Sequence, residues 1–191
     1  MTGDVVAVGA SLGGLDASRV LLAGLPLSFP CPLVLVQHRR AECDGRLVEI
    51  LSRHSCLPVL EPFDKDPILP GYVYVAPSNY HLSVERGYFS LSLADPVAFA
   101  RPSIDVLFES LADSYGSKAI AVMLTSSSRD GARGARAIKQ AGGVLIVEDP
   151  ATAEAPLGPR AVLEESEADA VLPLGEIAAY LIQRLDDSRG R

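Results

Sequence analysis

Short apolar runs alternate along the chain with longer segments in which apolar residues recur at helical spacing. The first run, Val5–Val8, is followed by the glycine-rich stretch Gly9–Gly14 and then by a segment from Leu15 to Leu22 with helical periodicity. Small or β-branched residues in an unbroken run predict a strand that is buried on both faces, as strands of parallel sheets are. Ser11 is therefore predicted on a tight turn between a buried strand and a helix, beside the free N–H groups of the helix start.

The same alternation continues through the rest of the chain. Buried strands are predicted at residues 32–37, 57–60, 72–76, 119–124, 144–147 and 170–173, helices at 45–54, 101–115, 131–140, 160–165 and 176–185, and a β-hairpin at 81–85 and 88–92. Strands that alternate with helices indicate an α/β fold: a doubly wound, mainly parallel sheet with helices on both faces, Rossmann-like in its three layers, with the β-hairpin as an excursion. We expect one domain over residues 1–185 and a charged, frayed C-terminal tail over 186–191.

Composition and charge narrow the classes of function. The 191 residues are 48% hydrophobic, enough for one domain with a substantial core, and the net charge of −7 argues against a nucleic-acid binder, which needs a basic face. No apolar run approaches the roughly 20 residues of a membrane span, and no basic segment typical of a signal peptide precedes the first strand. Cys31, Cys43 and Cys56 are odd in number and lack C-x-x-C spacing, so we expect thiols in a reduced cytoplasm rather than a disulfide or a zinc site.

Three interpretations compete for the turn that holds Ser11. The segment Gly9–Gly13 fits the G-x-S-x-G nucleophile elbow, in which small flanking residues permit a strained turn that exposes the serine oxygen. A glycine-rich loop after a first strand can instead cradle a phosphate, but the spacing here is not G-x-G-x-x-G and no Gly-Lys-Ser/Thr follows. The third interpretation is that Ser11 only caps the helix. The turn alone leaves all three open.

Two further polar side chains are predicted on the same edge of the sheet. His38 follows the predicted strand 32–37, and Asp130 lies in the loop after the strand 119–124. Because ligands of doubly wound sheets bind outside the carboxyl ends of the strands, we expect Ser11, His38 and Asp130 to lie together. These residue types perform acyl transfer when serine attacks, histidine takes its proton and aspartate holds the imidazole in the correct tautomer. Their order along the chain differs from that of α/β-hydrolases, in which the histidine comes last.

Each partner of Ser11 also has a simpler interpretation. A histidine at a strand end is commonly a loop residue that bonds the backbone, and Asp130, just before a predicted helix, is suited to cap it. Asp149 is a rival acid, because it also follows the carboxyl end of a strand. His54 and His81 have weaker claims, because no second member of a site is predicted beside either. The joint placement of three suitable side chains on one edge favours a catalytic site.

At these residues the chain resembles, over nearly its whole length, the catalytic domain of the CheB chemotaxis protein-glutamate methylesterases. The turn Val8–Gly14 is similar to the family's G-A-S-T-G-G, and Val36-Gln37-His38 is similar to its V-Q-H. Three further segments match in the same order, namely Pro70–Pro77, Arg101–Phe108, and Leu124-Thr125 with Arg129–Ala132. So many ordered segments make the resemblance specific.

The resemblance implies that Ser11, His38 and Asp130 form a catalytic triad and that the backbone N–H groups of Leu12 and Ser127 meet the oxyanion. The implied reaction is hydrolysis of glutamate methyl esters on chemoreceptors, with release of methanol, together with deamidation of certain receptor glutamines, in chemotaxis-type signalling in the cytoplasm. A methylated chemoreceptor or a related signalling protein is the implied partner, and neither a metal nor a cofactor is implied. The receiver domain that usually precedes this catalytic domain is not part of these 191 residues.

The chain departs from the family pattern around the implied site. Leu12 replaces a threonine, Ala100 replaces a histidine, Pro156–Pro159 replaces Phe-Gly-Met-Pro, and Ser126–Ser128 replaces Gly-Met-Gly. Serine tolerates positive φ less well than glycine, so we expect the 126–128 loop to follow another path and the esterase activity to be weak. Two other functions stay open: a catalytically weak or idle domain of this family that binds a receptor or signalling partner, and a nucleotide-binding module at the glycine-rich turn.

Overall fold

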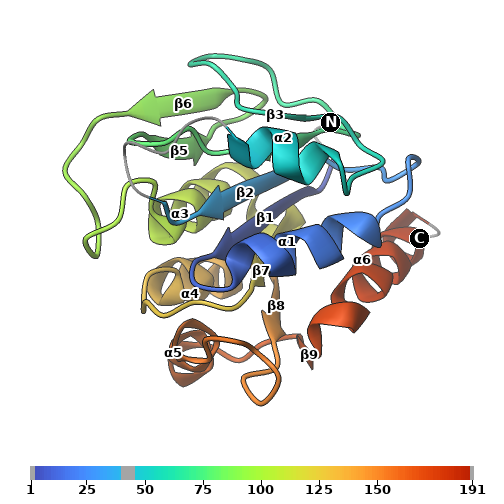
Figure 1. Cartoon of the computed structure of the whole chain (residues 1–191), viewed down its shortest axis with the longest axis vertical. Helices are drawn as coiled ribbons and strands as arrows, with labels where there is room; N and C mark the ends of the chain where they lie inside the picture. The colour runs from blue at the N-terminus through green and yellow to red at the C-terminus, as the bar shows by residue number, and fades with distance from the viewer. Residues whose placement is uncertain (1–2, 40–45, 190–191) are drawn as a thin grey trace.

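A parallel sheet forms the centre of the computed structural model, which describes residues 3–39 and 46–189 (Figure 1). The sheet has the spatial order β3-β4-β2-β1-β7-β8-β9, and every pair of neighbouring strands is parallel. These strands are β1 (Val5–Ala10), β2 (Leu33–Gln37), β3 (Val59–Leu60), β4 (Val73–Val75), β7 (Ala119–Met123), β8 (Val144–Glu148) and β9 (Ala170–Leu172).

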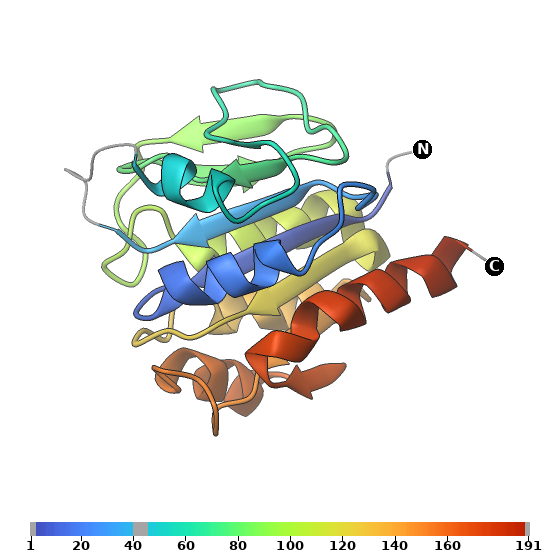
Figure 2. The same cartoon turned by 45° about the vertical axis from the view of Figure 1, so that its right-hand side comes forward.

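Helices cover both faces of the sheet, as predicted. In Figure 1, α1 and α6 lie in front of the sheet and α3 and α4 lie behind it, and the turned view of Figure 2 shows the same layers. One face carries α1 (Gly14–Ala23), α2 (Arg46–Ser52) and α6 (Leu174–Arg189), and the other carries α3 (Ile104–Tyr115), α4 (Ala132–Gln140) and α5 (Leu157–Glu165), with a 3₁₀ turn, η1 (Gly116–Lys118), between α3 and β7.

The position of β1 in the middle of the sheet explains why its sequence is apolar without interruption. Val5 and Ala7 face the core beneath α3 and α4, whereas Val6 and Val8 face the core beneath α1 and α6. All six residues of this strand are buried. A strand in the middle of a three-layer structure meets apolar side chains on both faces, so the predicted burial on both faces is confirmed.

The predicted β-hairpin is an antiparallel pair that stands apart from the main sheet. It consists of β5 (His81–Val84) and β6 (Phe89–Ser92) and lies on the face that carries α3. The Val84 N–H donates to the Ser110 hydroxyl of α3 (3.0 Å), and buried Phe89 contributes to the core on this face. The hairpin thus extends the core on this side of the sheet.

The structure differs from the prediction mainly at helix ends. α5 begins at Leu157, three residues early, because Pro159 lies in the first helical turn, where the N–H that proline lacks would have no partner in the helix. α6 runs from Leu174 to Arg189, so residues 186–189 continue a helix and are not the frayed tail that we expected. Neither glycine nor proline occurs between Glu176 and Arg189. The strands β3 and β4 are shorter than predicted, and residue 45 of the predicted helix 45–54 lies outside the described residues.

The strand order places a switch point at β1. From β1 the chain moves to β2 on one side, and it later returns to β7 on the other side. The loops that leave the carboxyl ends of β1 and β7 therefore diverge, which opens the crevice where ligands of doubly wound sheets bind. Ser11 follows β1, His38 follows β2 and Asp130 follows β7, so all three predicted side chains belong to this edge.

The close approach of α3 and α4 gives a test of the packing. A Cβ on Gly134 would lie 2.6 Å from the Phe108 Cβ and 3.0 Å from the Asp105 carbonyl oxygen. Gly134→Ala would gain about 1 kcal/mol of helix propensity, but we expect the clash with α3 to outweigh it and to lower the free energy of unfolding by about 1–3 kcal/mol. Urea denaturation measures this change.

Gly175→Ala is the matched control, because a Cβ on Gly175, also in the first turn of a helix, would meet no atom within 4 Å. This variant should be as stable as the wild type or slightly more so. Equal stability of both variants would show that α3 and α4 can separate without cost.

Candidate active site

Ser11 lies on the turn between β1 and α1. β1 ends at Ala10 and α1 begins at Gly14. The residue that caps α1 is Gly13, with a φ of 75°, so the interpretation of Ser11 as the helix cap is wrong. The Ser11 N–H donates to the Thr125 carbonyl (3.0 Å), which ties the turn to the chain leaving β7. The Ser11 hydroxyl makes no hydrogen bond to any residue that the structure describes, so it can rotate freely.

Gln37, the last residue of β2, joins the backbone of Ser11 to that of His38. Its Nε2 donates to the Ser11 carbonyl (2.7 Å) and to the His38 carbonyl (3.1 Å), and the His38 N–H donates to the Ala10 carbonyl (2.9 Å). These bonds fix the spacing between the serine and the histidine. Sequence reasoning had no role for Gln37; its place as a polar residue at the end of an apolar strand was the available signal.

His38 and Asp130 form the central polar contact of the site. His38 Nε2 lies 2.7 Å from Asp130 Oδ2, and Asp130 is 1% exposed. Burial alone would raise the pKa of Asp130, but hydrogen bonds from the His38 ring and from the Asp105 and Ile104 N–H groups hold that pKa below its ordinary value. An ionised carboxylate only accepts hydrogen bonds, so Nε2 carries a proton, and in the neutral imidazole Nδ1 keeps a lone pair. The imidazole can therefore act as a base through Nδ1.

The Asp130 carboxylate lies at the N-terminus of α3, not at that of α4, the helix that follows it in sequence. Oδ2 accepts the Ile104 N–H (2.7 Å), and Oδ1 accepts the Asp105 N–H (3.0 Å) and the Ser103 hydroxyl (2.8 Å). The cap of α4 is Gly131, which makes no side-chain bond, so the interpretation of Asp130 as the cap of the following helix is wrong. A helix N-terminus stabilises a negative charge, which keeps Asp130 ionised.

Asp105, in the first turn of α3, makes the reverse contact to α4. Its Oδ1 accepts the N–H groups of Gly131 (2.9 Å) and Gly134 (2.8 Å) at the start of that helix. Burial raises the pKa of Asp105, although the bond from Gly134 opposes this. Asp105 and Ser103 therefore position Asp130, a role that sequence reasoning missed. The available signal was that both residues fall in the segment 101–108, which carries the family resemblance.

Ser11 and His38 line one cavity of about 770 Å³ together with Leu12 and Ser127. The backbone N–H groups of Leu12 and Ser127 donate to no residue in the described part of the chain, whereas the N–H groups on either side of Ser127 both have partners. Two unused N–H groups in the cavity of the serine are donors of the kind that an oxyanion needs. The five site residues selected from the sequence thus meet at this edge, with Asp130 behind the imidazole.

The loop Ser126–Ser128 has ordinary backbone conformations. None of its residues has a positive φ, the conformation that serine tolerates less well than glycine. Ser126 Oγ accepts the Ser128 N–H (3.1 Å), and Ser128 Oγ accepts the Asp130 N–H (3.1 Å). These local side-chain bonds brace the loop. The different loop path and the weak esterase activity both stay predictions.

A further buried carboxylate supports the start of this loop. Glu148, at the end of β8, is 2% exposed and accepts the Thr125 N–H (2.7 Å). The Thr125 hydroxyl donates to the Leu12 carbonyl (3.0 Å) and accepts the Ala155 N–H (2.7 Å). Thr125 therefore joins the turn after β1 to the chain before α5. Burial raises the pKa of Glu148, although the bond from Thr125 opposes this.

The rival acid and the other two histidines lie elsewhere. Asp149 Oδ1 accepts the Ala151 N–H (2.8 Å) within its own turn. His81 is buried in β5, with Nε2 3.1 Å from the Asp95 carbonyl oxygen. His54 lies in the turn after α2. The acid that contacts His38 is thus Asp130.

The cysteines do not form a site in the described part of the chain. Cys31 is buried, Cys56 is exposed, and Cys43 lies outside the described residues. Across residues 3–39 and 46–189, no three His, Cys, Asp or Glu side chains are grouped so that they could hold a metal ion.

Comparison with known proteins decides the family. The family model described as CheB methylesterase matches residues 6–181, which is almost the entire domain. The chain belongs to the CheB methylesterase family. The crystal structure of the Thermotoga maritima CheB methylesterase catalytic domain superimposes on this CheB domain with a TM-score of 0.92 at 37% identity, and the match covers 96% of this chain and 100% of that one.

Curated relatives of this CheB domain carry the names of two activities. A protein of Leptospira interrogans, named provisionally as a protein-glutamate methylesterase/protein-glutamine glutaminase, is 43% identical over 98% of this chain and 97% of its own length. The protein-glutamate methylesterase/protein-glutamine glutaminase 2 of Anaeromyxobacter dehalogenans is 43% identical over 93% of this chain, which spans 52% of that relative's length. Within the described ranges, no helix of the CheB domain combines the length and apolar character that a membrane crossing requires.

The contact between His38 and Asp130 gives the first prediction at the site. Asp130→Asn should lower kcat by several orders of magnitude, about 10⁴-fold in a serine protease triad, because an amide at this position favours the wrong tautomer of His38. Both Asp130 oxygens accept backbone N–H groups, so the amide NH₂ would also face a donor, and the melting temperature should fall. Kinetics on folded protein, checked by circular dichroism, separate the two effects.

Asp149→Asn is the matched control, because its amide oxygen can still accept the Ala151 N–H. It should change kcat by less than about twofold, as a surface substitution does. A larger loss from Asp149→Asn than from Asp130→Asn would mean that the wrong acid has been assigned.

The raised pKa of Glu148 predicts that the stability of the protein depends on pH. The pKa of Glu148 is raised in the folded state above its ordinary value of 4.5. At a pH below 4.5 the carboxyl is protonated in both the folded and the unfolded state, so it does not lower the free energy of unfolding. As pH rises through the raised pKa, the unfolded state loses its proton more readily, and the protein loses stability. Glu148→Gln removes this titration and keeps an acceptor for the Thr125 N–H. The free energy of unfolding of Glu148→Gln minus that of the wild type should therefore be larger at pH 8 than at pH 4. Urea denaturation at both pH values measures this difference. A constant difference would contradict the raised pKa.

Proposed function

We propose that the protein is a serine esterase that hydrolyses methyl esters of glutamate side chains in a protein substrate. Ser11 is the nucleophile, His38 the general base and Asp130 the residue that orients the imidazole. The observation that carries the proposal is the contact between His38 and the buried carboxylate of Asp130, on the sheet edge that also holds Ser11, in a domain of the CheB methylesterase family.

The chemistry follows from the protonation states. The Ser11 oxygen attacks the ester carbonyl while His38 Nδ1 takes the hydroxyl proton, and the N–H groups of Leu12 and Ser127 donate to the oxyanion. The tetrahedral intermediate then expels methanol, which receives that proton from His38. Water attacks the resulting acyl-enzyme with His38 again as the base, which releases the glutamate carboxylate and restores Ser11. Asp130 stays ionised and stabilises the imidazolium in both steps.

The names of the relatives support the finer parts of the proposal. The same acyl-enzyme forms from a glutamine side chain with ammonia as the leaving group, so we include protein-glutamine deamidation, the second activity in those names. We further propose that the substrate is a methylated chemoreceptor or a related signalling protein and that the enzyme acts in the cytoplasm. The chemistry requires neither a metal nor a cofactor.

Phosphate binding at the glycine-rich turn is disfavoured by the carboxylate of Glu154, whereas the other acid of the Ser11 cavity, Asp16, pairs with Arg19 (2.7 Å). Asp16 and Glu154 line the cavity of Ser11, and Glu154 Oε2 lies 2.6 Å from the position that a Cβ on Gly13 would take. The N-terminus of α1 thus already faces a negative charge, which would repel a phosphate. We therefore do not propose a nucleotide-binding module. An idle domain that only binds a partner is the alternative that the test below addresses.

Ser11→Ala tests the proposal. Loss of the nucleophile should lower methanol release from a methylated receptor fragment by at least about 10⁴-fold and abolish labelling by a fluorophosphonate. The melting temperature should stay close to that of the wild type, because the Ser11 hydroxyl bonds to no described residue. Methanol is quantified by coupled oxidation.

Ser52→Ala, at an exposed hydroxyl on α2, is the control and should keep wild-type turnover. Wild-type turnover in folded Ser11→Ala protein would refute the nucleophile. Absence of methanol release and of labelling in the wild type would favour the idle binding domain.

A further inference from the structure

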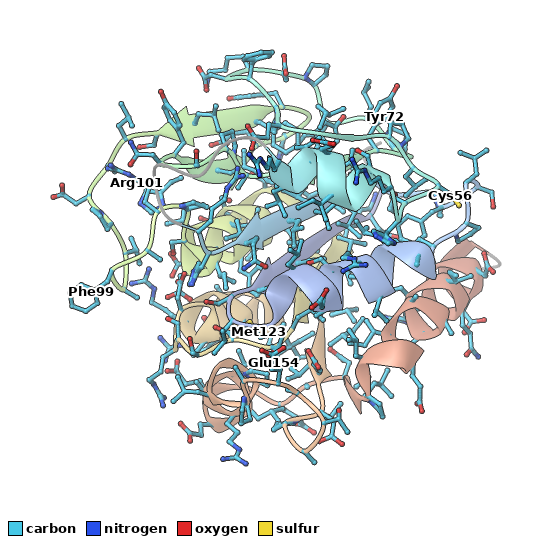
Figure 3. All side chains as sticks on the ribbon, viewed as in Figure 1. Cys56, Tyr72, Phe99, Arg101, Met123 and Glu154 are labelled. Carbon is cyan, nitrogen blue, oxygen red and sulfur yellow. The ribbon has the colours of Figure 1, made fainter. Side chains whose placement is uncertain are left out.

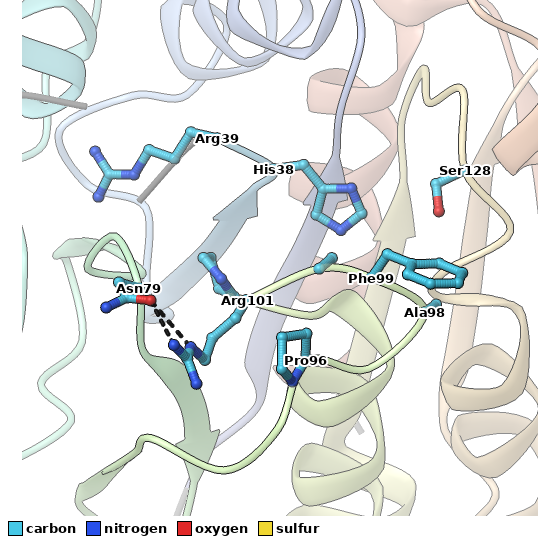
Figure 4. A pocket seen from close by; sticks show the side chains of 10 residues that line it. His38, Arg39, Asn79, Pro96, Ala98, Phe99, Arg101 and Ser128 are labelled. Carbon is cyan, nitrogen blue, oxygen red and sulfur yellow. Dashed lines mark hydrogen bonds between the residues drawn. The ribbon is translucent and has the colours of Figure 1, made fainter. Parts of the chain in front are cut away.

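A second cavity, of about 550 Å³, adjoins the candidate active site on the other side of His38. Figure 4 shows His38 at its margin, Arg101 and Asn79 on one side, and Phe99 with Ser128 on the other. Apart from His38, none of these side chains takes part in the proposed hydrolysis. Because this cavity shares His38 with the cavity of Ser11, a segment next to the ester can reach it, and its charge and shape bear on which substrates the enzyme accepts.

Arg101 is held rigidly but is not neutralised. Its Nε and Nη2 donate to Asn79 Oδ1 (3.1 and 2.6 Å), and its Nη1 donates to the carbonyl oxygens of Leu93 (3.0 Å) and Ala94 (2.9 Å). All these acceptors are uncharged. Within residues 3–39 and 46–189, Arg101 pairs with no carboxylate, and four bonds leave one of its five N–H groups unused. A fixed guanidinium of this kind is suited to a carboxylate from another molecule.

The other arginine of the cavity is already paired. Arg39 donates to Glu61 and to the Ala76 carbonyl (2.8 Å). Among the residues that the structure describes, no acidic side chain lines the cavity itself. The protein as a whole carries a net charge of −7, so this cationic wall is a local reversal of the overall charge. An acidic protein repels anionic groups over most of its surface, so a single local cation attracts an anionic group at this position and not elsewhere.

Phe99 stands on the rim of the same cavity in an unusual backbone conformation. Val97 and Ala100 exchange two backbone hydrogen bonds (3.1 and 2.8 Å), and the two residues between them, Ala98 and Phe99, have φ values of 47° and 64°. Glycine or asparagine normally occupies such positions, because the left-handed conformation costs other residues about 1–2 kcal/mol each. Phe99 is fully exposed and projects from the molecular surface in Figure 3.

Strain and exposure of an aromatic side chain contribute nothing to the stability of the fold. Such features gather at recognition sites, where an exposed aromatic residue supplies apolar contact area to a partner. The rim residue and the fixed cation lie on opposite sides of one cavity that ends at the proposed general base. Together they fit a segment that carries a negative side chain and presents some apolar surface beside it.

We propose that this cavity selects protein substrates with a carboxylate side chain close to the methyl ester: Arg101 binds the carboxylate and Phe99 packs on the same segment. The inference rests on the proposed function and adds a substrate feature to it. Hydrolysis of a glutamate ester itself produces a carboxylate, so a segment with several esters acquires this feature as the reaction proceeds. In a helical segment, residues four apart bring their Cβ atoms within about 6 Å, close enough for one to enter each cavity.

Two synthetic peptides test the proposal. Both are alanine-rich and helical and carry one glutamate γ-methyl ester. They differ only at the two positions four residues before and four residues after the ester, which are both Glu in one peptide and both Gln in the other. The wild type should show a kcat/KM for methanol release about five- to tenfold higher with the Glu peptide than with the Gln peptide. This preference should shrink as salt is added, because salt screens exposed charge pairs. The ratio within one enzyme cancels any effect of a variant on His38.

Arg101→Gln should bring the ratio of the two peptides close to one. Phe99→Glu is the second variant: its side chain is fully exposed, so folding is unaffected, and the added negative charge should repel the acidic peptide and lower the ratio below that of the wild type. Phe99→Lys should keep or raise the ratio. Phe63→Glu, which places the same charge on another exposed aromatic position outside this cavity, should leave the ratio at its wild-type value.

The outcomes separate this inference from the proposed function. Equal kcat/KM for the two peptides in the wild type would overturn the inference and leave the esterase in place. An unchanged ratio in both Arg101→Gln and Phe99→Glu would do the same. If the wild type releases methanol from neither peptide, the proposed function fails and the inference fails with it.

Discussion

The exchange of carboxylates between α3 and α4 is the interaction on which the candidate site depends. Asp130, which precedes α4, accepts two backbone N–H groups of α3. Asp105, in the first turn of α3, accepts two at the start of α4, from the cap Gly131 and from Gly134. A carboxylate without such donors would be costly to bury. Here each acid uses N–H groups that a helix start leaves without partners inside the helix. The exchange therefore satisfies both acids and fixes α3 against α4, which in turn fixes Asp130 against His38.

The two sides of His38 differ in charge, and the difference matches the two ends of the proposed reaction. The cavity that holds Ser11 is lined by Glu154 and by Asp16, which pairs with Arg19 (2.7 Å). The adjoining cavity is lined by Arg101 and by Arg39, which pairs with Glu61. A methyl ester is neutral and enters the acidic cavity without electrostatic cost. The carboxylate that hydrolysis forms there meets the like charge of Glu154, which disfavours its staying. The charge pattern thus distinguishes the ester from its product without any contact to the methyl group.

The sequence allowed prediction of the sheet, its layers and the edge that carries the site, because these depend on burial patterns along the chain. Strands buried on both faces and glycine-rich strand ends are local features. The way Asp130 is bound could not be predicted, because its partners on α3 lie about 25 residues away and local reasoning favours the following helix. The expectation for Ser126–Ser128 rested only on the φ preference of serine. In the structure, hydroxyl groups of this loop also accept backbone N–H groups. The predicted helix ends were wrong at Leu157, where Pro159 is compatible with the first helical turn, and beyond Leu185, where no glycine or proline occurs before Gly190.

The glycine at position 9 has a different explanation from the one that the sequence suggests. The sequence suggests a local reason, the flexibility of a turn, whereas the structure shows a close contact with a helix distant in the sequence. In the G-x-S-x-G pattern Gly9 was expected to permit a strained turn, yet it lies within β1, before the turn. A Cβ at Gly9 would lie 2.4 Å from Ile104 Cγ2, so the absence of a side chain lets the first residue of α3 reach the end of β1. β2 and β7 lie on opposite sides of β1, and His38 and Asp130 must therefore meet across it. The Ile104 N–H that binds Asp130 reaches that meeting point only because α3 starts directly beneath Gly9. The glycine that precedes the proposed nucleophile thus serves the contact between the other two members of the site.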